Sequence, residues 1–408
     1  MSRSLAYMTI EAVIGAMRSA LGEGLLSVYL YGSLSDGTYQ ADQSDINLIA
    51  IVDDSANLHV LRDEYRSSIW NARGPVLRRV PLLATIPTLK RHLRLNPLLN
   101  AHLRRSGQLF FGRSIGFETG PTVSAQEELA KIAVNAVRAS AALAPELLPA
   151  KEAQESLALL RSLARRLFGW PVDADESPAV LAGRVLGFAR KKMEEESLAL
   201  WPDQVTPDAP PLVGELRAIY EMDSHLILVM PDLEPVDLAR RIASADWSQV
   251  ADRVADQYRS LRVTTPSQLR LIVAFEDSAD YLVQSYHHAW GADPLGDFEI
   301  SWPFAFRGLA RLPSELLLAG LPHSYFTAED SDLSMLVHDF QNKLLNIQLR
   351  SELLSRALDI PSEVPADPLP ERDAPEDVRI DGILSHLDWW ADHYTGLMQK
   401  SAVAEEVD

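Results

Sequence analysis

Residues that could hold a phosphorylated ligand and a metal ion gather near the N-terminus. Between residues 27 and 52 the chain reads SVYLYGSLSDGTYQADQSDINLIAIV, in which two apolar runs flank a polar loop. Gly32 lets the backbone approach a ligand, and the hydroxyl of Ser33 with nearby N–H groups could face phosphate oxygens. Alternation along the second run places Asp45 and Asn47 on one face. Two such side chains could ligate Mg²⁺, although the amide lacks a negative charge.

This pattern resembles the signature of the nucleotidyltransferase superfamily, of the DNA polymerase β-like, minimal or aminoglycoside type, in which Gly-Ser and a spacer precede two alternating acids. The resemblance implies a mixed-sheet palm that binds a nucleoside triphosphate and uses Mg²⁺ to transfer a nucleotide. Here the second acid is Asn47, and the strand expected to bear a third acid, over residues 76–85, has none. Arg79 takes that place, and an arginine can bind phosphate but cannot ligate Mg²⁺.

The metal site therefore looks degenerate, with Asp45 the remaining expected ligand and Asn47 a weak second. Gly32, Ser33 and Arg79 are the expected nucleotide contacts. Asp36 would repel phosphate so soon after Gly-Ser. Asp36 or Asp42 could instead be a displaced metal ligand.

Charge is unevenly distributed along the 408 residues, whose formal net charge is -19. Residues 1–120 contain 13 basic and 10 acidic residues, whereas the other 288 contain 25 basic and 47 acidic residues. Eleven lysines and arginines lie within residues 62–113. This basic segment could attract phosphate, or it could dock on the acidic remainder of the chain. The overall acidity argues against a nucleic-acid partner.

Apolar periodicity and turn residues predict an α+β protein with three parts. The expected parts are a palm over 1–120, an all-α domain over 121–330, and a helical hairpin over 331–408 with a proline-rich acidic loop at 359–377. Within the palm we expect a helix over 5–21, strands over 26–31 and 45–52, a helix over 56–72 and a strand over 76–85. Two short helices and a last strand over 108–112 follow.

The hairpin contains a second candidate site at His338. Its first helix reads LVHDFQNKLLNIQLRSELL, with a 4-3 apolar seam that includes Val337. The segment resembles the phosphoacceptor box of histidine-kinase and sporulation-type phosphotransferase hairpins, which implies an exposed His338 oriented by Asp339, with Asn342 and Lys343 near a phosphoryl group. The alternative is a hairpin that only packs or dimerises.

Other histidines are weaker candidates. His287 and His288 fall on a predicted helix, where adjacent side chains diverge and suit one metal poorly. His386 and His393 are seven residues apart on the last helix and are expected at an interface.

Three functions follow from these residues. The favoured one is a regulatory or signalling protein with an eroded metal site that still binds a nucleotide, with Mg²⁺ and a nucleoside triphosphate as doubtful cofactors. The second is an active Mg²⁺-dependent enzyme that transfers a nucleoside monophosphate to a hydroxyl group. The third is a phosphorelay intermediate that uses His338. For each we expect a cytoplasmic homodimer paired through the hairpin, without a membrane or nucleic-acid partner.

Overall fold

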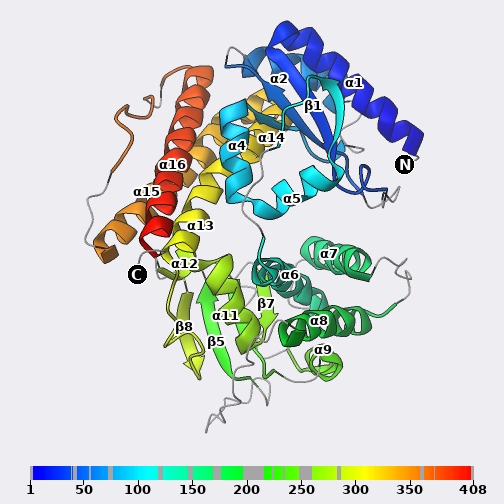
Figure 1. The fold of residues 1–408 in the computed structure, drawn as a ribbon, viewed down its shortest axis with the longest axis vertical. Helices are drawn as coiled ribbons and strands as arrows, with labels where there is room; N and C mark the ends of the chain where they lie inside the picture. The colour runs from blue at the N-terminus through cyan, green and yellow to red at the C-terminus, as the bar shows by residue number, and fades with distance from the viewer. Residues whose placement is uncertain are drawn as a thin grey trace. The chain divides into compact units, whose positions relative to one another are not determined.

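The chain forms two compact units (Figure 1). Unit 1 contains residues 1–123 and 306–408, and unit 2 contains residues 124–305. The computed structural model describes residues 3–37, 39, 44–54, 57–71, 77–117, 123–145, 150–168, 176–195, 216–222, 225–232, 235–247, 260–282, 286–358, 363–371 and 373–405. The predicted α+β class is confirmed by helices and a small mixed sheet in each unit.

Unit 1 begins with a sheet and the helices that cover it. Its elements are α1 (Arg3–Leu21), β1 (Leu25–Tyr31), β2 (Asn47–Val52), α2 (Leu58–Tyr65), a π-helical turn (Arg66–Trp70), β3 (Leu82–Ala84), α4 (Ile86–Leu95), α5 (Pro97–Ser106) and β4 (Gln108–Gly112). The strand order is β3-β2-β1-β4, with β1 antiparallel to both neighbours and β2 parallel to β3. The predicted strand over 76–85 is shorter than expected, because only Leu82–Ala84 pairs with β2.

The remainder of unit 1 is helical. Its elements are α13 (Trp302–Glu315, which begins just before the unit boundary), a π-helical turn (Leu316–Gly320), α14 (Leu321–Thr327), α15 (Leu333–Leu358) and α16 (Glu376–Glu405). Figure 1 shows α15 and α16 side by side, as predicted for a hairpin, and the two helices pack on each other. The seam side chains Val337, Phe340 and Leu344 are at most 3% exposed, because the unit's own helices cover them.

Three arginines of the basic segment anchor these helices to the sheet domain of unit 1. Arg62 donates to the carbonyl oxygens of Tyr325 and Ala328 and to Asp330 Oδ1 at 2.6 Å. Arg66 pairs with Asp330 and Glu329, and Arg91 pairs with Asp388 and Asp392. For these arginines the structure supports the docking interpretation of the basic segment.

Unit 2 contains a second sheet, so the prediction of an all-α domain over 121–330 is wrong. Its elements are α6 (Ala125–Ser140), α7 (Ala150–Phe168), α8 (Pro178–Glu195), β5 (Ala218–Met222), β6 (His225–Val229), α9 (Pro235–Ser244), β7 (Ser260–Thr264), α11 (Pro266–Phe275), α12 (Ser278–Leu282) and β8 (Tyr286–Gly291). The strands are only five or six residues long, too short for periodicity to separate strand from helix. His287 and His288 accordingly lie on β8 rather than on a helix.

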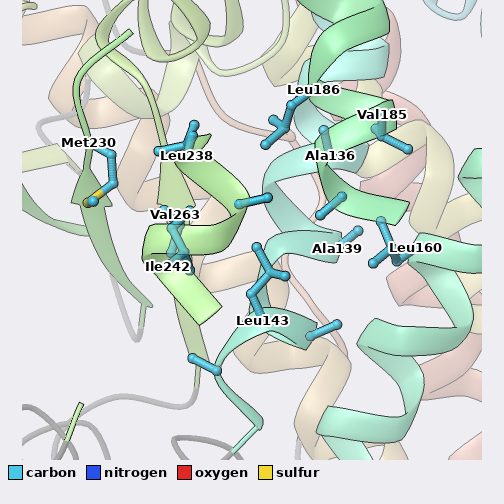
Figure 2. Close-up of a cluster of buried hydrophobic side chains, with 14 of the residues drawn as sticks. Ala136, Ala139, Leu143, Leu160, Val185, Leu186, Met230, Leu238, Ile242 and Val263 are labelled. Atoms are coloured by element: carbon cyan, nitrogen blue, oxygen red, sulfur yellow. The ribbon is translucent and has the colours of Figure 1, made fainter. Parts of the chain in front are cut away.

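The core of unit 2 joins its helices to this sheet. Figure 2 shows Ala136, Ala139, Leu143, Leu160, Val185 and Leu186 from the helical side gathered with Met230, Leu238, Ile242 and Val263. All of these side chains are at most 8% exposed. Burial of so many apolar groups supplies the main driving force for folding of this unit.

The two sheets have the same topology. The order β7-β6-β5-β8 repeats β3-β2-β1-β4, again with the first strand antiparallel to both neighbours and the second parallel to the third. In both sheets the last strand has a register shift immediately before a buried tyrosine of the first strand, Tyr29 or Tyr220. In both, a threonine caps the helix that follows the third strand, Thr85 or Thr265.

A glycine with positive φ ends the last strand of each sheet. Gly112 has φ 81° and Gly291 has φ 90°. A Cβ at Gly112 would lie 1.9 Å from the carbonyl oxygen of Leu26, and a Cβ at Gly291 would lie 2.1 Å from that of Arg217. The next residue in each case donates its N–H to the same carbonyl, at 3.4 Å for Arg113 and 2.9 Å for Ala292. The same frame is therefore built twice along the chain.

The sheets differ in the connection between their first two strands. Tyr31 pairs with Asn47 at the end of the first hairpin, and Met222 pairs with His225 at the end of the second. Residues 32–46 thus connect β1 to β2, whereas residues 223–224 connect β5 to β6. The longer loop contains Gly32, Ser33 and Asp45. The candidate nucleotide site is therefore an addition to a frame that also forms without it.

Replacement of either strand-end glycine by alanine is expected to destabilise its unit by more than about 3 kcal/mol, because the backbone must move to clear a carbonyl oxygen. Gly37→Ala is the matched control, since Gly37 has φ 85° but nothing lies within 4 Å of its added Cβ among the described residues. That control should lose about 1 kcal/mol. Denaturant unfolding of the three variants measures this, and equal losses in all three would contradict the close approach.

Burial of His92 on α4 generates a pH dependence. The side chain is 5% exposed, and its Nδ1 lies 2.9 Å from Ser314 Oγ. Burial, with Arg311 and Arg91 nearby, lowers the pKa of His92 from 6.5 to about 4. The unfolded chain therefore binds more protons between these two values, and stability falls as the pH drops through this window.

Between pH 7 and pH 5 this single group should cost unit 1 about 2 kcal/mol of unfolding free energy. Urea unfolding at both pH values should show a smaller drop for His92→Gln than for wild type. The exposed His287 supplies the control variant His287→Gln, which should retain the full drop. If His92→Gln loses as much unfolding free energy between pH 7 and pH 5 as wild type does, His92 is not the source of the pH dependence.

Candidate functional site

The loop between β1 and β2 begins with a tight turn at Gly32. Gly32 has φ 83°, and its carbonyl oxygen accepts the N–H groups of Ser35 and Asp36 at 3.0 and 3.1 Å. An added Cβ at Gly32 would lie 2.8 Å from Asn47 Nδ2. Only glycine allows the turn and the Asn47 side chain to lie this close. The sequence predicted a close approach of Gly32 to a ligand, which stays a prediction.

Asp45, Asn47 and Arg79 meet beside this turn. Asn47 Nδ2 donates to Asp45 Oδ1 at 3.1 Å, and Arg79 Nε lies 3.6 Å from Asp45 Oδ2. The intervening Ile46 and the following Leu48 are each 2% exposed, which confirms the predicted alternation. Arg79, which was expected in the place of a third acid, pairs with the Asp45 carboxylate from a position before β3 (Leu82–Ala84) rather than on it. Both side chains are partly exposed, at 73% for Arg79 and 29% for Asp45, so the pair adds little stability.

The pKa of Tyr31 reflects the charges of this cluster. Burial raises the pKa of its hydroxyl to about 12, the Arg79 guanidinium opposes that shift, and the Asp45 carboxylate adds to it. The hydroxyl therefore stays protonated at neutral pH. It can donate or accept a hydrogen bond, but it carries no charge.

His102 is a residue of this site that the sequence did not indicate. Its Nε2 accepts the N–H of Gly32 at 3.0 Å. Burial lowers the pKa of His102, with Asp36 opposing the shift and Arg105 adding to it. The neutral imidazole thus accepts the hydrogen bond of an N–H group that we expected to face phosphate. Nothing in the spacing of α5 points to this contact, since His102 lies 70 residues from Gly32.

These residues do not fit a Mg²⁺ site. Mg²⁺ requires a near-octahedral set of oxygen ligands, usually including one or two free carboxylates. Here the Asp45 carboxylate already accepts from Asn47 and pairs with Arg79. Across the part of the chain that the structure describes, no three acidic or histidine side chains gather as a metal site. Asp42, the other loop candidate, lies outside the described residues, and Asp36 is exposed.

The second candidate, His338, is exposed on α15 beside the buried Val337. Asp339 pairs with Lys343 at 2.7 Å, and the Lys343 ammonium lies 4.2 Å from the centroid of the Phe340 ring. The lysine therefore holds the carboxylate that was expected to orient the imidazole. Asn342 is exposed one turn after His338.

The last two histidines contact the proline-rich loop of the same chain. His386 Nε2 lies 2.9 Å from the carbonyl oxygen of Asp367, and His393 Nδ1 lies 3.4 Å from Glu363 Oε2. Burial lowers the pKa of both imidazoles, while the loop carbonyl and carboxylate oppose the shift. They act as an internal interface between α16 and its own loop.

Comparisons of the chain with protein-family models, with curated proteins and with solved structures find no match. Among the described residues, no helix combines the length and apolar character needed to cross a membrane. The resemblance to nucleotidyltransferases therefore depends on the residues themselves, and function must be argued from the site.

The site geometry generates a gain-of-function test. Because Asn47 and Arg79 both contact Asp45, the double variant Asn47→Asp, Arg79→Asp should bring three carboxylates together. We expect it to bind Mn²⁺ with Kd on the order of 0.1–1 mM by calorimetry, while wild type shows no measurable binding. Adding Asp45→Asn should abolish the gain. A double variant that folds yet binds no Mn²⁺ would contradict the convergence of these side chains.

Proposed function

We propose that this chain is a non-catalytic nucleotide-binding protein with a regulatory or signalling role, built on a nucleotidyltransferase-type palm whose metal site has been lost. The ligand would be a nucleoside triphosphate held at the loop between β1 and β2. Ser33 and Arg79 would contact its phosphates. Binding would need no metal ion, because the Arg79 guanidinium supplies positive charge where Mg²⁺ would otherwise lie.

The pairing of Arg79 with Asp45 is the observation on which this proposal depends. A carboxylate that is neutralised by a neighbouring arginine attracts a cation weakly. A phosphate oxygen, in contrast, can compete for the same guanidinium, because Arg79 is mostly exposed and can turn toward a ligand. The geometry therefore favours anion binding over metal-assisted transfer.

The repeated frame supports the same assignment. Two sheets with the same pairing show that the frame itself does not require Gly32, Ser33 or Asp45. Loop 32–46 is then free to serve a ligand. Its hydrogen bond to His102 also supplies a means of regulation, since an incoming phosphate would have to displace the imidazole from the Gly32 N–H.

Nucleotide binding is measured by titrating wild type with labelled ATP and GTP in Mg²⁺ and in EDTA. One nucleotide should bind with affinities that agree within about threefold between the two conditions, since no metal takes part. Arg79→Glu should weaken binding about tenfold or more, because it removes a charge-assisted contact and adds repulsion. Arg104→Glu, at an exposed arginine of α5, is the charge-matched control and should bind normally.

The rival enzymatic function makes the opposite prediction. Mg²⁺-dependent transfer of a labelled nucleotide to an acceptor, lost in Asp45→Ala, would refute a non-catalytic role. Absence of nucleotide binding in both conditions would refute the binding role as well.

Phosphotransfer through His338 is a second candidate function, favoured by the exposure of His338 on a helix that is otherwise held by its buried seam. Incubation with phosphorylated receiver domains should then give an acid-labile label on wild type that is lost in His338→Ala. His287→Ala removes another exposed histidine and should keep the label. Label retained in His338→Ala, or absent from wild type, would dismiss this function.

Homodimerisation through the hairpin accompanies this second candidate. The seam is already buried within unit 1, so pairing would use the outer face of α15, where Leu345 is 57% and Leu349 is 55% exposed. Such a pair of helices would leave His338 on or beside the interface.

A further inference from the structure

A groove between α4 and α16 in unit 1 lies apart from the residues discussed as a site. Four residues of each helix line it, at matching i, i+3, i+4, i+7 spacing, so that one face of each helix forms a wall. The lining residues are Pro87, Lys90, Arg91 and Arg94 of α4, and Asp392, Thr395, Gly396 and Gln399 of α16. The groove has a volume of ≈ 400 Å³, within the size range of small-molecule sites.

The α4 wall is strongly cationic. Lys90 and Arg94 are exposed and one helical turn apart, and Arg91 lies between them. Two carboxylates oppose these three cations, that of Asp392 in the lining and that of Asp388 beside it, and both pair with Arg91. An anion entering the groove would therefore meet an excess of positive charge, with walls that reduce screening by solvent.

Arg91 is held in a fixed position for such a ligand. Its guanidinium pairs with Asp388 and Asp392, and its side chain is 12% exposed. Its Nε–H is buried and has no hydrogen-bond partner among the described residues. This atom is closed off from solvent, so a ligand in the groove would contact Arg91 through the part of its side chain that remains exposed.

The α16 wall leaves room for the ligand. Gly396 lies in the interior of the helix, where glycine is unfavourable compared with alanine. A Cβ added there would have no described atom within 4 Å. Any larger residue at this position would project into open space beside the cationic wall.

We propose that this groove binds a small molecule bearing a phosphate group, held by Lys90, Arg91 and Arg94. Three clustered cations suit a dianionic phosphate better than a single carboxylate, and the planar guanidinium groups can donate paired hydrogen bonds to phosphate oxygens. The site is independent of Ser33 and Arg79, so it stands whether or not the loop between β1 and β2 binds a nucleotide.

Calorimetric titration of the full chain at low salt with inorganic phosphate and with glucose 6-phosphate tests the site. The proposal expects saturable binding of at least one probe, weakened about tenfold or more in Gly396→Leu, which fills the groove without changing its charge. Whichever probe binds more tightly shows whether the site takes free phosphate or a phosphate ester, and either supports the proposal.

Gly15→Leu is the matched control, because Gly15 is also a helical glycine whose added Cβ meets nothing within 4 Å among the described residues. It should bind like wild type, as should Arg104→Gln at an exposed arginine of α5. Lys90→Gln combined with Arg94→Gln should lose binding. If neither probe binds, or if the double variant loses binding while Gly396→Leu keeps it, the anion is attracted by surface charge alone and the groove is not a site.

Discussion

The close approach of the end of the last strand to the backbone at the start of the first strand constrains both sheets. At Gly112 and Gly291 the backbone passes so near a carbonyl oxygen that no side chain fits, and the positive φ at each glycine turns the chain away from the sheet. This contact fixes the register of the last strand on the first. Tyr29 and Tyr220 reinforce it, since the Tyr29 hydroxyl bonds the backbone of Ile115 and the Tyr220 hydroxyl donates to Asp293.

A frame fixed in this way leaves the first hairpin connection free to vary. In unit 2 the connection is two residues long, and in unit 1 it contains the turn at Gly32 and the acid Asp45. The side chains around that loop determine which ligands it can bind. Arg79 neutralises Asp45 from one side, and His102 takes the Gly32 N–H from the other. Both contacts favour a site that binds an anionic ligand over one that binds metal ions.

Much of unit 1 could be predicted from the sequence, because its signals are local. The alternation that buries Ile46 and Leu48, the glycine turn at Gly32 and the 4-3 seam of α15 can each be read from a few neighbouring residues. The same residues define the candidate site. The structure places Arg79 beside Asp45, and its substitution for an acid stays a prediction.

What could not be predicted depends on contacts between distant segments. His102 reaches Gly32 across 70 residues. Strands β5 to β8 are only five or six residues long, and β7 and β8 pair with strands far away in the chain, so the longer helices around them give the stronger local signal. The repeat of the frame could not be predicted from the sequence either. It consists of the same strand pairing and of isolated equivalent residues such as Thr85 and Thr265, and no continuous stretch of sequence repeats.

The proposed ligand of unit 1 is a nucleotide, bound with Arg79 in the place of a metal ion. The most direct test of this proposal is a crystal structure with a non-hydrolysable nucleoside triphosphate and Mn²⁺, whose anomalous signal identifies the metal. We expect triphosphate density at Ser33 and Arg79, with His102 displaced from the Gly32 N–H and no anomalous peak at Asp45. A Mn²⁺ peak bound to Asp45, with Arg79 turned away, would contradict the proposal.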